Sequence, residues 1–215
     1  GEITAFHTSK TIDYVEGEAE EAYDERLDRF TRRMVFIKPE AVLIFDVLDA
    51  PEPSSFQWWL HAPVEFRIHS QDNIRVRNGA AAARTSFLWP QEVDVSVTDE
   101  FNPPPQLDRE LVQYHLTAVP GARSEHQNFV TVLRPHRSDT QLAGNAELTR
   151  IDGGYAVRVP LEEGEARVLL QDDAGPQIRG LGITTDAAAG AVVFDEDGNL
   201  ETTFASEGGS VRVEE

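Results

Sequence analysis

Six histidines are the residues in this sequence best suited to acid–base or metal chemistry. No two of them have the HxH or HExxH spacing that brings two ligands to one side of a strand or helix. A shared site would have to be assembled by the fold, and scattered structural or surface histidines explain them equally well. The sequence also has no GxSxG, glycine-rich phosphate loop or paired-carboxylate motif, so we predict neither a catalytic residue nor a metal site. The six are His7, His61, His69, His115, His126 and His136.

The most aromatic stretch covers residues 56–61, with the sequence FQWWLH. Tryptophan rings offer an apolar surface on which sugar rings stack. Because consecutive residues of a strand point to opposite faces, Trp58 and Trp59 cannot both line one open groove. One of them therefore belongs to a core, and a purely structural role for both is the alternative.

Two tyrosines lie near a group of arginines, a combination that could supply acid–base chemistry and bind an anion. The acidic residues between them allow another interpretation, in which the arginines form a solvated network of ion pairs. The group consists of Tyr14 and Tyr23 with Arg26, Arg29, Arg32 and Arg33, interleaved with Asp24, Glu25 and Asp28.

Residues 195–199, with the sequence DEDGN, resemble the start of a calcium-binding loop. The bidentate glutamate expected six residues after Gly198 is missing, because Phe204 occupies that position. The apolar residues on either side favour a β-hairpin turn, with Gly198 in the left-handed conformation.

The balance of acidic and basic residues limits the kinds of molecule that this chain can bind. The chain has 215 residues, with 19 lysines and arginines against 38 aspartates and glutamates, and its formal net charge is −19. Nucleic acids and anionic membranes need concentrated positive charge, so we expect neither as a partner. The absence of cysteine excludes disulfides, thiolate metal sites and thiol nucleophiles. Because the chain begins at Gly1 and its only methionine is Met34, we expect it to be a segment of a longer protein.

The elements that must position these residues are strands. Apolar residues alternate with polar ones in residues 93–98, 155–159 and 211–213, as in antiparallel strands with one buried face. Residues 34–37 and 42–45 are continuously apolar and predict a hairpin that is buried on both faces. The best helical candidate is residues 19–30, although its apolar face is poor.

Short strands separated by proline and glycine turns predict an all-β fold, an antiparallel β-sandwich. After residues 134–139 the strands become shorter and richer in glycine. We therefore predict a β-sandwich over residues 1–139 and a small C-terminal β domain over residues 140–215, packed on the first.

Four segments, in order, resemble the C-terminal β region of the heparinase II/III-like polysaccharide lyases. The first resembles the family's dY…GD…aY pattern, with Asp13-Tyr14, Gly17-Glu18 and Ala22-Tyr23 in those places. The second resembles an arginine-led apolar hairpin that ends in aspartate, the third a W-x-L-H strand, and the fourth the strand that closes the sandwich. They cover residues 3–23, 32–46, 58–61 and 128–135.

The resemblance implies part of an enzyme that cleaves uronate-containing polysaccharides by β-elimination, located in the periplasm or secreted. The partner of this chain would be an N-terminal α/α-toroid of the same protein, carrying the catalytic groups. Zinc, where the family holds it, would be bound upstream of Gly1, so no cofactor is expected in this chain. The chain alone would be inactive, serving as scaffold and cleft wall, with His7, Tyr14, Trp58 and His61 as substrate-binding residues.

Two other functions fit the same sequence. An independent carbohydrate-binding module needs two or three exposed aromatic rings in one plane, for which the tryptophans and tyrosines are the candidates. A structural or adhesive β domain needs only a surface that contacts other proteins.

Overall fold

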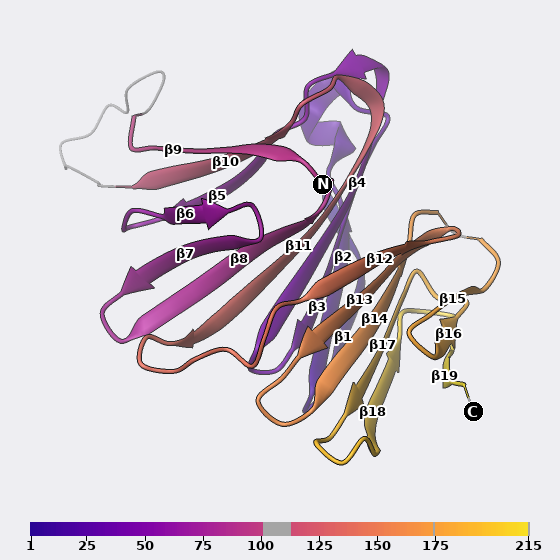
Figure 1. The fold of residues 1–215 in the computed structure, drawn as a ribbon. Helices are drawn as coiled ribbons and strands as arrows, with labels where there is room; N and C mark the ends of the chain where they lie inside the picture. Colours follow the sequence, from indigo (N-terminus) through magenta and orange to yellow (C-terminus); the bar gives the residue numbers. More distant parts are fainter. Residues whose placement is uncertain (101–112, 174, 215) are drawn as a thin grey trace.

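The structure is a computed structural model that describes residues 1–100, 113–173 and 175–214. Within these residues the chain forms nineteen strands and one short 3-10 helix, η1 (Glu20–Arg26). All of the strand pairs are antiparallel, which confirms the predicted all-β class. Figure 1 shows the strands fanned into broad, twisted sheets.

The largest sheet has eight strands and contains most of the first half of the chain. In spatial order these are β1 (Glu2–Thr8), β2 (Ile12–Glu18), β3 (Arg29–Ile37), β4 (Ala41–Ser54), β11 (Ser124–Arg137), β8 (Ala81–Trp89), β7 (Asn73–Asn78) and β6 (Arg67–Ser70). A three-stranded sheet contains β5 (Trp58–Ala62), β10 (Tyr114–Pro120) and β9 (Val93–Thr98).

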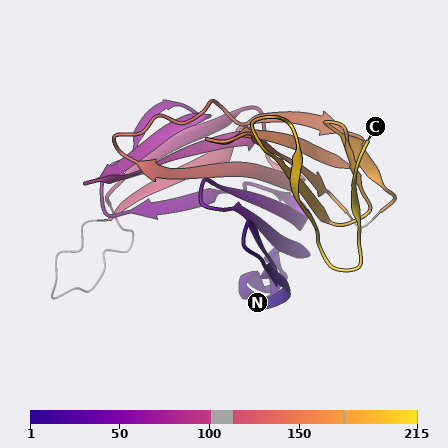
Figure 2. The ribbon, with the colours of Figure 1, turned by 90° about the horizontal axis from the view of Figure 1, so that it is seen from below.

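The second half of the chain forms the other two sheets. The five-stranded sheet contains β12 (Glu147–Ile151), β13 (Gly154–Pro160), β14 (Glu165–Gln171), β17 (Ala189–Phe194) and β18 (Leu200–Ala205). A small three-stranded sheet contains β15 (Ile178–Gly180), β16 (Ile183–Thr185) and β19 (Val211–Val213). Figure 2 shows these C-terminal strands packed beside the large sheet.

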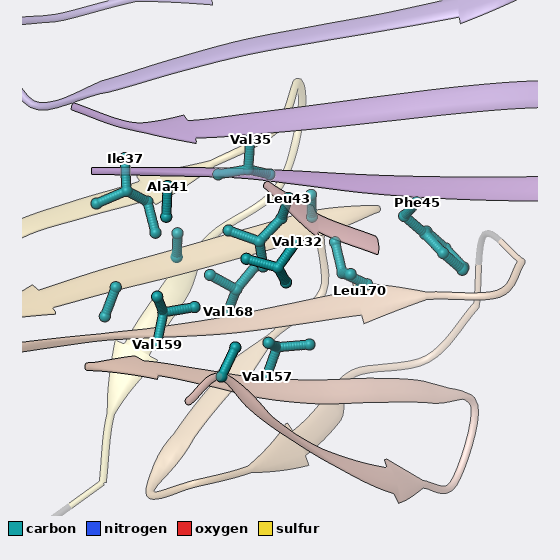
Figure 3. Packing of buried hydrophobic residues seen from close by; sticks show 14 of the residues in the cluster. Val35, Ile37, Ala41, Leu43, Phe45, Val132, Val157, Val159, Val168 and Leu170 are labelled. Atoms are coloured by element: carbon teal, nitrogen blue, oxygen red, sulfur yellow. The ribbon is translucent and has the colours of Figure 1, made fainter. Parts of the chain in front are cut away.

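Three hydrophobic clusters join the four sheets. The largest cluster lies between the eight-stranded and five-stranded sheets and is shown in Figure 3. A second lies between the opposite face of the eight-stranded sheet and the sheet of β5, β10 and β9. A third joins the five-stranded sheet to the small sheet. The central strands of the two middle sheets are therefore buried on both faces.

The predicted hairpin of residues 34–45 is confirmed as β3 and β4, which pair from Arg29↔Asp49 to Ile37↔Ala41. The position of β4 between two cores explains why apolar and polar residues do not alternate in its sequence. Leu43 and Phe45 belong to the first cluster, whereas Ile44 and Leu48 on the other face belong to the second. A strand between two cores needs apolar residues at consecutive positions.

The predicted helix over residues 19–30 was wrong in type and length. Only η1 forms, it is broken at Asp24 with φ +53°, and none of its residues is buried. From Arg29 onward the chain enters β3, where each residue gains a partner in β4. A helix with so little apolar surface to bury cannot compete with those ladder hydrogen bonds.

Residues 195–199 form the predicted turn between β17 and β18. Asp195 Oδ1 accepts hydrogen bonds from the backbone N–H groups of Asp197 and Asn199. Gly198 has φ +80°, the left-handed conformation that favours glycine.

Residues 140–215 form sheets of their own, but they do not bury their main core without the first part of the chain. The largest cluster takes Leu43, Phe45 and Val132 from the eight-stranded sheet, and Val157 and Val168 from the five-stranded sheet. The two predicted units therefore meet across a shared sandwich core.

Candidate functional site

A cleft of about 690 Å³ opens where η1, the strands β3 and β4, and the edge strand β5 meet. Its walls combine aromatic rings, arginines and small polar side chains. The side chains that matter most below are Tyr23, Arg26, Arg32, Asp46, Trp58 and Trp59.

Trp58, Asp46 and Arg32 form a fixed group at the base of this cleft. The indole Nε1 of Trp58 donates a hydrogen bond to Asp46 Oδ2 at 2.9 Å. The guanidinium of Arg32 donates two hydrogen bonds to the same carboxylate, from Nε to Oδ1 at 2.5 Å and from Nη2 to Oδ2 at 2.8 Å. It also lies 5.9 Å from the centre of the Trp58 ring, within cation–π range.

The hydrogen bonds of this group oppose a role for Asp46 as a general base. Burial raises the pKa of Asp46, and the opposing effects of Arg32 and Trp58 do not cancel that rise. Burial alone would lower the pKa of Arg32, but the hydrogen bonds and charge of Asp46 outweigh it and raise that pKa. Both oxygens of Asp46 already accept hydrogen bonds from protein donors. Asp46 therefore holds Trp58 and Arg32 in place.

The mouth of the cleft carries the exposed rings. Tyr23 and Trp59 are 46% and 47% exposed, and the Tyr23 ring packs at 5.7 Å against Phe30. Arg26 is exposed beside them. The flat apolar rings can stack on a sugar ring, and the neighbouring guanidinium can bind a carboxylate that the sugar carries.

Trp58 is only 4% exposed and belongs to a core cluster, as predicted for one member of the pair. Both tryptophans nevertheless line this cleft, Trp58 at its base and Trp59 at its mouth, so the prediction that they cannot share one groove was wrong. His61 shares the outer face of β5 with Trp59. Its ring stacks at 4.5 Å on His115, which lies opposite it in β10. Trp59, His61 and His115 thus form an aromatic group on the outer face of the three-stranded sheet.

His7 and Tyr14 lie elsewhere, opposite one another on β1 and β2. Both rings contact Phe204, at 5.1 and 5.2 Å. Tyr14 is 2% exposed, so it has almost no surface to offer a polysaccharide. Its hydroxyl donates to Glu16, and burial followed by this hydrogen bond raises its pKa well above the ordinary value. The four residues predicted to bind substrate therefore lie in two separate groups.

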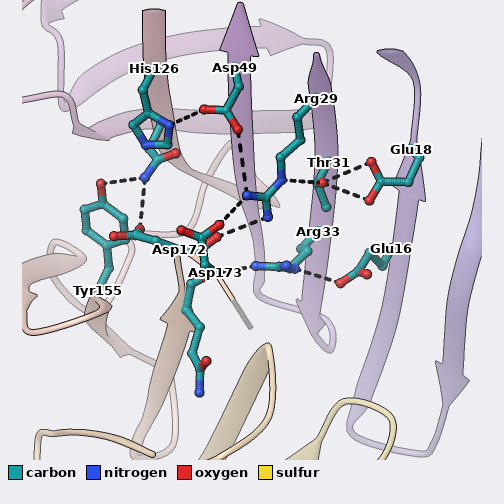
Figure 4. Close-up of polar contacts among 12 residues, drawn as sticks. Glu16, Glu18, Arg29, Thr31, Arg33, Asp49, His126, Tyr155, Asp172 and Asp173 are labelled. Atoms are coloured by element: carbon teal, nitrogen blue, oxygen red, sulfur yellow. Dashed lines mark hydrogen bonds and ion pairs between the residues drawn. The ribbon is translucent and has the colours of Figure 1, made fainter. Parts of the chain in front are cut away.

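A polar network between the two large sheets was missed from the sequence (Figure 4). Arg29 on β3 pairs with Asp173, and Asn128 on β11 donates to Asp172 at 2.9 Å. Arg33 reaches the Gln171 carbonyl at 2.6 Å. The partners are more than forty positions apart, so only the abundance of arginine and aspartate could have indicated the network. Three members of the predicted arginine group, Arg29, Arg32 and Arg33, form ion pairs. Their carboxylate partners are Asp173, Asp46 and Glu16, which are not the interleaved acidic residues of the prediction.

In the described residues, no group of three or more histidine, aspartate or glutamate side chains is placed to hold a metal ion. No helix among the same residues is long and apolar enough to cross a bilayer.

No protein-family model matches the chain, and no curated protein matches its sequence. The fold does have solved counterparts. Heparan sulfate lyase HepC from Pedobacter heparinus superimposes with a TM-score of 0.60 over 81% of this chain, at 10% sequence identity. A mutant of that enzyme gives 0.57 over the same share, at 11% identity.

This chain shares its fold with part of a polysaccharide lyase. The match covers 28% of the HepC chain, so the present chain corresponds to about a quarter of that enzyme's length. At this level of identity the likeness is one of fold.

Proposed function

We propose that this chain is the β-sandwich portion of a polysaccharide lyase, made of the units 1–139 and 140–215. It forms a scaffold and one wall of the cleft that holds a uronate-containing polysaccharide. Its partner is an α/α-toroid of the same protein, and the whole enzyme acts in the periplasm or outside the cell. The observation that carries the proposal is the fold shared with a quarter of HepC.

The chemistry of the cleft supports a binding role. β-Elimination needs a base for the uronate C5 proton, a group that stabilises the carboxylate and an acid for the leaving oxygen. Arg26 and Arg32 are suited to the carboxylate, and Tyr23 and Trp59 to the sugar ring. None of the described residues that line this cleft is a histidine. The proposal places the base and acid on the toroid, outside this chain, so that the chain is inactive alone.

Of the residues first assigned to substrate, the proposal retains Trp58 as the support of Arg32, and His61 beside Trp59. His7 stays a candidate at the exposed edge strand β1. Ile3 and Phe6 on the same strand are also exposed, which suits a surface that packs against the rest of the enzyme.

The test compares this chain with the same chain extended upstream through a toroid. Each is incubated with a panel of uronate polysaccharides while the absorbance of the unsaturated uronate product is followed. Product from the extended protein alone supports the proposal, and product from this chain alone contradicts it. In the extended protein, Trp59→Ala is expected to weaken substrate binding, whereas Trp89→Phe is the control at a tryptophan outside the cleft.

The two exposed rings at the cleft mouth, Tyr23 and Trp59, are the observation that favours one alternative function, an independent carbohydrate-binding module. Such a module binds glycan in isolation, and its extended protein forms no product. Product formation by the extended protein therefore separates the alternatives.

A further inference from the structure

Four arginines form a row across the end of the large sheet that contains β6, β7, β8 and β11, strands that lie side by side in Figure 1. The register pairs Arg67 with Arg75, Arg75 with Arg84, and Arg84 with Arg134. Residues opposite one another on neighbouring strands point to the same face. With strands about 4.8 Å apart, the row spans about 14 Å.

The same face carries Arg77 and His136 next to this arginine row. Arg77 lies two residues beyond Arg75, and His136 two residues beyond Arg134. Both sit opposite Ala82, a small residue that leaves space above the sheet. The opposite face of these strands is apolar and packs into a core through Ile74 and Phe87. The cationic residues are thus confined to one side of the sheet.

The arginine row is poorly neutralised, although the chain has twice as many acidic as basic residues. Among the described residues, Arg67, Arg75, Arg77 and Arg84 have no carboxylate within ion-pair distance. Nine other arginines do have one, including Arg134, whose nearest carboxylate is Glu40 at 3.7 Å. Like charges opposite one another destabilise a sheet. An anion bound over the row would relieve that repulsion.

A groove lies over three members of the arginine row, Arg67, Arg75 and Arg84. It consists of two cavities of about 630 and 250 Å³, and Arg75 and His136 line both. Glu65 is the one carboxylate among the described residues that line either cavity. We call these two cavities together the arginine groove.

Arg84 is the second, independent indication of a ligand. It lines the smaller cavity and is only 7% exposed, and its Nε has no hydrogen-bond partner. Its Nη1 and Nη2 donate to the neutral oxygens of Asn145 and Gly144. Burial, and then the nearby charge of Arg75, lower the pKa of Arg84. A buried guanidinium with an unused donor, placed among other cations, would be stabilised by negative charge bound nearby.

We propose that the arginine groove binds the carboxylate or sulfate groups of an acidic polysaccharide, at a site separate from the aromatic cleft. Guanidinium groups bind both anions with paired hydrogen bonds. A sugar that carries one anionic group per residue repeats on a scale close to the strand spacing, so consecutive groups can meet consecutive arginines. None of the described residues that line the groove is a tryptophan, tyrosine or phenylalanine that could stack on a base, which disfavours a single-stranded nucleic acid.

The test is direct binding to this chain, followed by fluorescence anisotropy of labelled probes. The probes are a heparin hexasaccharide, a polyuronate hexasaccharide, neutral cellohexaose and an oligothymidylate. We expect both acidic hexasaccharides to bind, and the double variant R75A/R77A to bind them about tenfold or more weakly. The slope of log affinity against log salt should also become shallower in this variant.

Arg212→Ala is the matched control, because Arg212 is an exposed arginine on β19 in a different sheet. It should bind the hexasaccharides as the parent chain does, and circular dichroism should show that every variant is folded. R75K/R77K should recover part of the affinity, because lysine keeps the charge without the paired geometry.

The proposal is overturned by unchanged binding in R75A/R77A, or by an equal loss in Arg212→Ala. It is equally overturned if cellohexaose binds as well as the acidic sugars, or if only the oligothymidylate binds. Its failure is distinguishable from failure of the proposed function, because product formation by the extended enzyme is a separate measurement.

Discussion

Trp58 and Trp59 are consecutive residues that lie in opposite environments. Trp58 is buried and hydrogen-bonded to Asp46, and Trp59 is half exposed at the cleft mouth. Trp58→Phe keeps an aromatic ring but leaves the buried Asp46 without one donor. It should reduce the free energy of unfolding by about 1–3 kcal/mol. Urea unfolding followed by circular dichroism measures this.

Trp59→Phe is the matched control and should change the free energy of unfolding by less than about 0.5 kcal/mol. Equal losses in both variants would show that the hydrogen bond to Asp46 contributes little.

Glu16 gives a prediction for pH. Burial raises its pKa, but hydrogen bonds from Tyr14 and the charge of Arg33 outweigh burial, and the pKa lies below the ordinary 4.5. A carboxyl with a lowered pKa stabilises the fold fully above its ordinary pKa, and the contribution is lost as pH falls through the lowered value. Glu16→Gln should therefore flatten the decline of stability on the acid side of pH 4.5.

The measurement for Glu16→Gln is the unfolding midpoint in urea, taken in steps from neutral pH into the acid range. Glu125→Gln, at an exposed residue of β11, is the control and should follow the parent chain. A Glu16→Gln profile parallel to that of the parent would contradict the prediction.

At the scale of elements, the turn between β17 and β18 depends on one backbone conformation. A Cβ on Gly198 would meet no atom within 4 Å, so the cost of Gly198→Ala comes from its φ of +80°. We expect a loss of about 1 kcal/mol in the free energy of unfolding. Gly121 has the same open surroundings without the positive φ, so Gly121→Ala should be neutral or slightly stabilising. Thermal melts of the two variants test the difference.

Elements were predictable where burial alone dictates the sequence. The hairpin of β3 and β4 was visible because a strand between two cores must be apolar on both faces. The helix prediction for residues 19–30 was wrong. Their charge spacing suits a helix, but Arg29 and Phe30 form a strand because they pair with β4. Charge spacing is a local signal, and the ladder partner is about twenty positions away.

At the scale of the whole molecule, the shared core predicts a single cooperative unfolding transition. Leu43→Ala on β4 should cost about 2–5 kcal/mol and destabilise β13 and β14 as much as β3. Hydrogen exchange in the two halves measures this. Protection lost from the first half alone would show that residues 140–215 are an independent domain.

The same reasoning predicts the behaviour of the isolated halves. Residues 1–139 alone would expose the apolar face of β2, β3 and β4 that normally contacts the five-stranded sheet. We expect this fragment to bind a hydrophobic dye and to aggregate, in contrast to the whole chain. A soluble fragment with the circular dichroism spectrum of a folded β protein would contradict the prediction.

The candidate sites show why sequence reasoning reached only part of the surface. Strand alternation separated Trp58 from Trp59, because that rule needs only two neighbouring residues. The arginine row was invisible, because Arg67, Arg75, Arg84 and Arg134 align only through the registers of four strands. One residue of slip in any pair would turn an arginine to the apolar face.

The position of the arginine row also affects how charged molecules approach this protein. The chain has a net charge of −19, whereas the arginines of this row lie on strands at one edge of its largest sheet, so its charge is distributed unevenly. A polyanion that diffuses toward it is repelled by most of the surface and turned toward that edge. The orientation of the polyanion relative to this chain is thus set before the two make contact. Added salt slows their association even where the final contacts are unchanged.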